Sequence, residues 1–292
     1  MSIASLIPSG TDILAALGLG DRLVGVSHEC DHPIATGKPV LTASTLSADM
    51  APAAIDAAVS ASVADGGSLC RTDRSLLHQL APEVVLSQDV CDVCAVNGEV
   101  ARGDVPDGSR LVMLTAVRLH DLWDDLLRVG AATGAQDAAA RLVADTRADI
   151  EATRAAVAGE ATTRVVTLDW GIPPFAAGHW VPDLVEAGGG LDVLASSDPM
   201  SRRITWPQVA EAAPDVVIFL PCGYDLDQAV AEAASLPVDE LRAAAVWAVD
   251  ATRLFSRCTP QSVVAGARVM AQILHPHLVG PPDPADAVRI RT

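Results

Sequence analysis

Residues 136–159 read QDAAARLVADTRADIEATRAAVAG. Leu142, Val143, Ile150 and Val157 recur at near-helical spacing, no proline interrupts them, and glycine stands only at the end. The pattern predicts one amphipathic helix, which at 1.5 Å per residue would be about 36 Å long. A helix of that length can join two lobes as a rigid strut.

Short apolar runs alternate with helical patterns on both sides of this helix. SIASLI, LVGVS, EVVLS and LVMLT precede it, and VVTLD, VVIFL and VWAVD follow it. Such alternation is typical of parallel sheets covered by helices. We therefore expect an α/β protein with two Rossmann-like lobes: an N-terminal lobe over 1–135, the interlobe helix over 136–159 and a C-terminal lobe over 160–292. The proline-rich tail GPPDPADAVRIRT is expected to be irregular.

Charge and termini limit the classes of function. The formal net charge of -17 argues against nucleic acid as a partner, because phosphate binding needs clustered Lys and Arg. The start MSIASLIPSGTD shows no secretory signal, and no apolar run approaches the roughly 18 residues of a membrane span. We expect a cytoplasmic protein without membrane insertion, whose six cysteines are free thiols or ligands.

Polar and aromatic residues follow the expected strands. Ligands of open parallel sheets bind beyond the carboxyl ends of the strands, so these residues are the candidates for a binding cleft. They are His28, Glu29, Cys30 and His32 after LVGVS, Cys91 and Cys94 after EVVLS, Trp170 and Phe175 after VVTLD, Cys222 after VVIFL, and Arg257 after VWAVD. We expect these strand ends from both halves to converge on one cleft.

The Cys91-x-x-Cys94 pair has three interpretations: two small core residues, a thioredoxin-type couple, or part of a metal site. A redox couple would leave the His-Glu-Cys-Asp-His run at 28–32 unexplained. Cys91 and Cys94 together with Cys30 or His28 match the ligand types and spacing of tetrahedral zinc or iron sites.

Three histidines and one tryptophan keep a structural alternative. His28 and His32 also fit loop histidines that bond their own backbone. His179 and Trp180 fit either the cleft or a helix start, with Trp180 as a hydrophobic staple and His179 as a capping residue. No G-x-S-x-G elbow and no phosphate-binding loop is present, so the sequence does not favour an enzyme, although a metal-dependent activity stays open.

Five stretches carry a family resemblance across nearly the whole chain: SLIPSGTDILAALGLGDRLVGVSHECDHP, LAPEVVLSQD, VVTLDWGIPPFAAGHW, AAPDVVIFLPCG and VDATRLFSRCTP. In these the sequence resembles the helical-backbone substrate-binding proteins of ABC transporters, and among them the cobalamin-binding members. The resemblance implies the class III periplasmic-binding-protein fold, with a ligand held between the lobes. It also implies that Phe175 and Arg257, which match by motif, line the site.

The sequence departs from that family at three points. Glu29 and His32 stand where similar periplasmic members carry tyrosines, Pro207 lies where an acidic docking residue is expected, and a secretion signal is not visible. These departures put docking to an ABC importer in doubt and favour a cytosolic relative, with export by another route as the alternative.

The leading hypothesis is a non-catalytic protein that binds cobalamin or a related corrinoid as its ligand. Its expected binding residues are His28, Glu29, His32, Trp170, Phe175, His179, Trp180, Cys222 and Arg257. The alternative is a zinc or iron site built from Cys30, Cys91, Cys94 and His28, in a carrier or a metalloenzyme.

Overall fold

Two structural units, each with its own main sheet, make up the chain in the computed structural model. The structure describes residues 1–46, 50, 52–64, 68–90, 98–237, 241, 243 and 245–291. Unit 1 comprises Met1–Ala116 and His120–Ala144, and unit 2 comprises Val117–Leu119 and Asp145–Thr292. The segment Val117–Leu119 therefore belongs with unit 2, although its neighbours on both sides in the chain belong to unit 1.

Unit 1 is built on a parallel four-stranded sheet with the order β2-β1-β5-β6. Its elements in chain order are β1 (Ile3–Ser5), α1 (Pro8–Ala16), η1 (Gly20–Arg22), β2 (Leu23–Gly25), η2 (Pro33–Ala35), β3 (Thr42–Ser44), α2 (Pro52–Ala64), β4 (Cys70–Thr72), α3 (Arg74–Leu80), β5 (Val84–Gln88), α4 (Gly98–Asp104), β6 (Arg110–Leu114) and α5 (Asp121–Thr133). The strands β3 and β4 form a separate antiparallel pair. The four apolar runs expected in the first half thus form the parallel sheet.

Close packing of α1 on the sheet depends on one glycine. A Cβ atom at Gly10 would lie 2.6 Å from the Ser5 hydroxyl oxygen and 3.1 Å from the Leu86 Cβ, so a larger residue would push the helix away from β1 and β5. Pro8 begins α1 at a position where its missing N–H costs nothing. Pro8 and Gly10 thus allow α1 to begin soon after β1 and to pack closely on the sheet.

Unit 2 is built on a mixed sheet with the order β10-β8-β7-β11-β12-β13, and β9 also pairs with β7. Its elements are β7 (Thr163–Gly171), β8 (Pro174–Ala176), α7 (Val181–Ala187), β9 (Gly190–Asp192), β10 (Arg202–Arg203), α8 (Trp206–Glu211), β11 (Val216–Phe219), α9 (Leu226–Ala233), β12 (Ala245–Val249), α10 (Ala251–Leu254), α11 (Pro260–Leu274), α12 (Pro276–Val279) and β13 (Ala287–Arg291). The strands β7, β11 and β12 are parallel as expected, and β9, which the sequence analysis does not predict, pairs parallel with β7. The pairs β7–β8, β8–β10 and β12–β13 are antiparallel.

The expectation of an irregular C-terminal tail is wrong from Ala287 onward. The prolines at 281, 282 and 284 stand before the strand, and AVRIR then alternates apolar and basic residues, the period that suits a strand. Val288 pairs with Ala248 of β12, and Ile290 packs against the buried core of unit 2. The prolines before the strand made the whole tail look irregular in the sequence, so this short pattern was missed.

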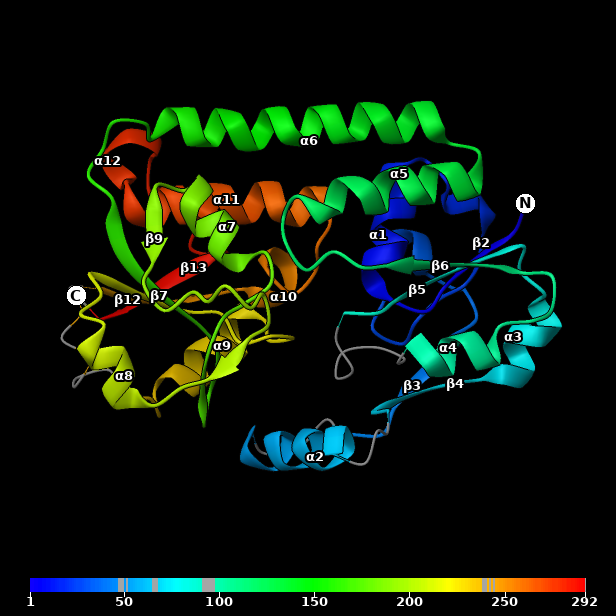
Figure 1. Ribbon diagram of the computed structural model, residues 1–292, viewed down its shortest axis with the longest axis horizontal. Helices are drawn as coiled ribbons and strands as arrows, with labels where there is room; N and C mark the ends of the chain where they lie inside the picture. Colours follow the sequence, from blue (N-terminus) through cyan, green and yellow to red (C-terminus); the bar gives the residue numbers. More distant parts are fainter. Residues whose placement is uncertain are drawn as a thin grey trace. The chain divides into compact units, whose positions relative to one another are not determined.

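The long helix α6 (Gln136–Ala156) is present where the sequence predicts it, and Figure 1 shows it following α5 after a tight turn. Gly134 makes that turn at φ +72°, a conformation that favours glycine. The boundary between the two units falls inside α6, between Ala144 and Asp145. None of the helices within the described ranges combines the length and the apolar character needed to cross a membrane.

Candidate functional site

Thr42 of β3 orients His28, which follows β2 on the carboxyl side of the unit 1 sheet. The Thr42 hydroxyl oxygen accepts from the His28 backbone N–H at 3.0 Å and lies 2.6 Å from His28 Nδ1, while the hydroxyl itself donates to Ser27 Oγ at 3.1 Å. Thr42 therefore holds the His28 ring at Nδ1, and the tautomer of the ring decides which of these two atoms is the donor.

The other ring nitrogen of His28, Nε2, lies 3.2 Å from Glu29 Oε1, at ion-pair distance. A histidine whose Nδ1 is held by a protein group is the usual arrangement of a metal ligand. Among the described residues of unit 1, Nε2 of His28 is therefore a candidate metal ligand.

Cys30 and His32 lie on the same loop, Cys30 in contact with α1 and His32 with its own loop. The Cys30 sulfur lies 3.1 Å from the Thr11 hydroxyl oxygen of α1. His32 Nδ1 accepts from the Ile34 backbone N–H at 3.3 Å and so caps η2, which matches the loop-histidine alternative for this residue.

Cys91 and Cys94 lie outside the described residues, so the predicted four-ligand metal site is not placed. Within the part of the chain that the structure does describe, no three His, Cys, Asp or Glu side chains gather in a metal-binding arrangement. The cysteines inside the described ranges, which are Cys30, Cys70, Cys222 and Cys258, are thiols and form no disulfide with one another.

The carboxyl edge of the unit 2 sheet is aromatic. Trp170 on β7 and Phe175 on β8 are paired across the hairpin, so their side chains share one face. The Tyr224 ring meets the Trp170 ring edge-on, with centroids 5.6 Å apart and an interplanar angle of 76°. The Arg203 guanidinium lies 5.3 Å from the centroid of the Phe175 ring, within cation–π distance.

This concentration stands out because aromatic residues make up only 3% of the chain. Trp170, Phe175, Trp180, Tyr224 and Phe255 lie at or beyond strand ends of unit 2, whereas Trp123 is the one aromatic residue in the sequence of unit 1. The two strand-end edges therefore offer different chemistry: imidazole, thiol and carboxylate in unit 1, and flat aromatic rings in unit 2.

Backbone contacts bring the loops of unit 2 together. The Cys222 N–H donates to the Asp169 carbonyl at 3.1 Å, and the Gly223 N–H donates to Ser256 Oγ at 3.0 Å. The Trp180 indole N–H donates to the Phe255 carbonyl at 3.0 Å. The exposed Cys222 and the half-exposed Arg257 thus lie on loops that are hydrogen-bonded to those of Trp170 and Trp180.

His179 has an unusual environment. Its φ of +56° is in the left-handed region, its N–H donates to the Pro199 carbonyl, and its Nε2 is buried with no hydrogen-bond partner. Burial, and next the positive charge of Arg118, lower the pKa of the His179 imidazole. Helix α7 begins without a side-chain cap, so His179 does not have the capping role that was one of its alternatives.

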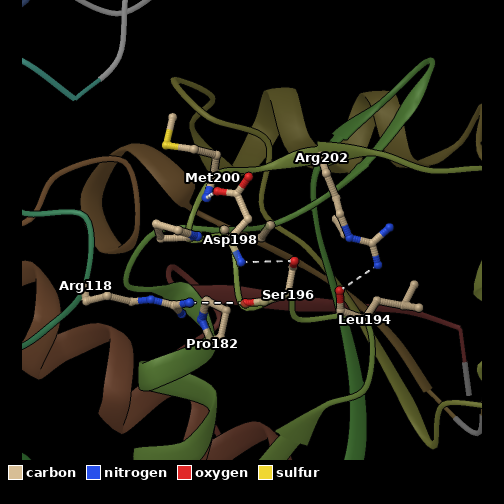
Figure 2. Close-up of a pocket in the computed structure, with 11 residues that line it drawn as sticks. Arg118, Pro182, Leu194, Ser196, Asp198, Met200 and Arg202 are labelled. Atoms are coloured by element: carbon tan, nitrogen blue, oxygen red, sulfur yellow. Dashed lines mark hydrogen bonds between the residues drawn. The ribbon is translucent and has the colours of Figure 1, made fainter.

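Figure 2 shows a recess lined by Arg118, Pro182 and Arg202, in which the two arginines hold one loop. Arg118 Nη2 donates to the Ser196 carbonyl at 3.1 Å, and Arg202 Nη2 donates to the Leu194 carbonyl at 2.9 Å. The recess measures about 200 Å³, a volume that includes open solvent at its mouth, and it leaves no room for a ligand. We interpret its two arginines as structural supports of the loop.

Sequence reasoning missed Thr42, Tyr224 and Arg203. Thr42 reaches His28 from a strand pair that no local pattern connects to the loop. Tyr224 stands two residues after Cys222 and is the single tyrosine of an aromatic-poor chain. That position after a predicted strand was the signal in the sequence that could have identified it. Arg203 belongs to a strand of two residues that no apolar run marks.

The comparisons with known proteins agree with this architecture. Residues 3–253 match the family model described as periplasmic binding protein. A periplasmic heme-binding protein from Pseudomonas aeruginosa is similar at 17% identity and a TM-score of 0.73, over 100% of this chain and 99% of that one. A possible iron-binding, periplasmic solute-binding protein from Staphylococcus epidermidis has 19% identity and a TM-score of 0.71, over 94% and 98%.

The periplasmic vitamin B12-binding protein BtuF of Vibrio cholerae has 19% identity and a TM-score of 0.68, over 94% of this chain and 96% of that one. No curated protein sequence matches the chain. At these identities the likeness to solved structures establishes the class III periplasmic-binding-protein fold alone.

Proposed function

Because the chain belongs to the periplasmic binding protein family, we propose that it is a non-catalytic protein that binds a large, planar, metal-containing ring, with cobalamin or a related corrinoid as its ligand. The observation that carries the proposal is the difference between the two strand-end edges. Unit 2 gathers Trp170, Phe175 and Tyr224 in a chain that is otherwise poor in aromatic residues. Unit 1 presents the oriented Nε2 of His28.

The two edges suit different parts of such a ligand. A corrin or porphyrin ring has a broad apolar face that packs well against tryptophan and tyrosine rings. The metal ion at the centre of the ring can accept a nitrogen ligand, and imidazole is a good ligand for iron and related transition-metal ions. The relatives from Vibrio cholerae and Pseudomonas aeruginosa, whose names refer to vitamin B12 and heme, support this ligand class.

Titration of the full chain with cyanocobalamin, hydroxocobalamin and hemin, followed by absorption and tryptophan fluorescence, tests the proposal. We expect one corrinoid per chain, and a change in the corrin spectrum with hydroxocobalamin, whose axial position exchanges readily. The variant His28→Ala should lose the spectral change with hydroxocobalamin while retaining most of the affinity for cyanocobalamin. Absence of binding by all three ligands would contradict the proposal.

A second candidate is a transition-metal carrier or metalloenzyme for zinc or iron. It is favoured by Nε2 of His28, which lies beside the Glu29 carboxylate, and by the name of the relative from Staphylococcus epidermidis. Elemental analysis of protein purified without chelator separates the two candidates. Stoichiometric zinc or iron that is lost in His28→Ala, without any corrinoid binding, would favour the metal.

We propose the cytoplasm as the site of action. Docking to an ABC importer is then not required. Cell fractionation with detection of the native protein tests this part of the proposal. An extracytoplasmic location would favour the role of a receptor for an importer.

A further inference from the structure

Trp170, Phe175 and Arg203 form a row across the antiparallel strands β7, β8 and β10. Trp170 of β7 is paired with Phe175 of β8, and Phe175 is paired on its other side with Arg203 of β10. Residues directly opposite each other on antiparallel strands project from the same face of a sheet. An indole, a phenyl ring and a guanidinium group therefore lie side by side on one face of the unit 2 sheet.

Contacts within this row and beside it hold its groups in position. The Trp170 indole N–H donates to the Ile172 carbonyl at 3.2 Å, and the Tyr224 ring meets the Trp170 ring edge-on. At the other end of the row, the Arg203 guanidinium lies 5.3 Å from the centroid of the Phe175 ring. Because an aromatic ring attracts a cation at this distance, Phe175 keeps the positive charge of Arg203 next to the aromatic surface.

The preceding residue, Arg202, has a different role. It is paired with the buried Ala176, and its Nη2 donates to the Leu194 carbonyl at 2.9 Å (Figure 2). Since successive side chains of a strand project to opposite faces, Arg202 and Arg203 point away from each other. Arg202 thus supports a loop of unit 2, whereas the exposed Arg203 meets solvent beside the aromatic rings.

The chemistry of Arg203 suits an anionic group of a ligand. A guanidinium has five N–H donors in one plane, so it can contact protein groups and a ligand at the same time. It matches the oxygens of a carboxylate or a phosphate in a bidentate arrangement. In a chain with 37 acidic and 20 basic residues, a positive charge beside the rings attracts locally an anion that the surface as a whole repels.

We propose that Arg203 is a specificity-determining residue, whose guanidinium binds an anionic group at the edge of a ring ligand that packs on Trp170 and Phe175. The inference rests on the proposed function, because it takes this aromatic face as the ring-binding surface. The anionic group has two sources among the ligands of that class: the phosphate of cobalamin and the propionate carboxylates of hemin.

Matched pairs of ligands test the inference. Dicyanocobinamide keeps the corrin ring of cyanocobalamin and lacks its phosphate, and hemin dimethyl ester keeps the porphyrin of hemin without a free carboxylate. Absorption and fluorescence titrations of the full chain give the affinities for all four rings. We expect Arg203→Ala to lose roughly tenfold to a hundredfold in affinity for the anionic member of a pair. Its affinity for the other member should stay nearly unchanged.

Two further variants separate the charge of Arg203 from its packing. Arg203→Lys keeps the charge without the bidentate geometry and should recover part of the affinity. Arg289→Ala removes one positive charge from the exposed strand β13, at the other end of the same sheet, and should change none of the affinities. Raising the KCl concentration from about 0.05 to 0.5 M should weaken binding of the anionic ligand more in wild type than in Arg203→Ala. Circular dichroism establishes that each variant is folded.

The pattern of losses separates the inference from the proposed function. A selective loss with cyanocobalamin identifies the phosphate as the bound group, a selective loss with hemin identifies the carboxylates, and either result supports the inference. Equal losses for both members of each pair, or no loss at all, would overturn the inference and leave the proposed function standing. Absence of binding by all four rings would refute the proposed function and the inference together.

Discussion

The ring of His28 is held by Thr42, whose Oγ1 lies 2.6 Å from Nδ1 although fourteen residues separate the two in the chain. This bond fixes which nitrogen of the imidazole remains available to a metal. Bonds of this kind to the second nitrogen of a ligating histidine typically contribute 10- to 100-fold to metal affinity.

Replacement of Thr42 by valine should therefore weaken the contact of His28 to hydroxocobalamin by about tenfold or more, since the ring loses its hydrogen-bond partner at Nδ1. Thr42→Ser keeps the hydroxyl and is the matched control. Absorption titrations of both variants provide the measurement. Identical spectra for Thr42→Val and wild type would show that His28 does not meet the metal.

Trp170→Ala should weaken corrinoid binding by roughly tenfold, because aromatic contacts are worth about 0.5–1.5 kcal/mol beyond the area they bury. Trp170→Phe, which keeps a flat ring, should restore most of the affinity. Trp123→Phe in α5 controls for the loss of a tryptophan distant in sequence from every predicted strand-end residue of unit 2. Calorimetric titration gives the three affinities. Equal affinities for Trp170→Ala and wild type would show that the Trp170 ring does not contact the ligand.

Asp125 of α5 supports the end of β6. It is only 2% exposed, and its carboxylate accepts from the backbone N–H groups of Thr115 at 2.9 Å and Ala116 at 3.0 Å. Asp125→Asn places an amide there and leaves a buried donor without its acceptor, which should lower the free energy of unfolding by about 1–3 kcal/mol. Asp124→Asn, on the exposed side of the same helix, should change it little in urea denaturation.

The same carboxyl predicts a dependence of stability on pH. Burial raises the pKa of Asp125 more than its hydrogen bonds lower it, so its contribution to stability is complete at low pH and declines as the pH rises through the raised value. Urea denaturation from pH 4 to 8 should show a smaller slope in Asp125→Asn than in wild type. An equal slope in both proteins would contradict this assignment.

Arg118 should control the titration of His179. Its positive charge lowers the pKa of the His179 imidazole, in addition to the larger effect of burial. Arg118→Ala should therefore raise the His179 pKa part of the way toward its ordinary value, as measured by NMR titration of the ring protons. Arg202→Ala removes the other arginine of the recess and should leave the His179 titration unchanged. If the His179 pKa rose in Arg202→Ala and not in Arg118→Ala, the lowering charge would be that of Arg202, which would contradict this prediction.

The sequence predicted the parallel strands β1, β2, β5, β6, β7, β11 and β12 and the long helix, because apolar runs and helical spacing are local signals. It failed at Ala287–Arg291, where five residues were too few to stand out behind the prolines, at the short strand β9, and at the antiparallel strands β8 and β10, which depend on hairpin geometry. Trp170 and Trp180 are predicted site residues because they come soon after an apolar run, and their role in binding stays a prediction. Thr42 and Arg203 were not predicted, because their roles arise from tertiary contacts that bring distant elements together. Cys91 and Cys94 remain a prediction outside the described residues.

The most direct test of the central claim is isothermal titration of the full chain, purified without chelator, with cyanocobalamin, alongside elemental analysis of the same sample. Binding of one corrinoid per chain that is weakened in Trp170→Ala, by protein free of stoichiometric metal, is the predicted result. No heat of binding with cobalamin or hemin, from protein that retains stoichiometric zinc or iron, would contradict it.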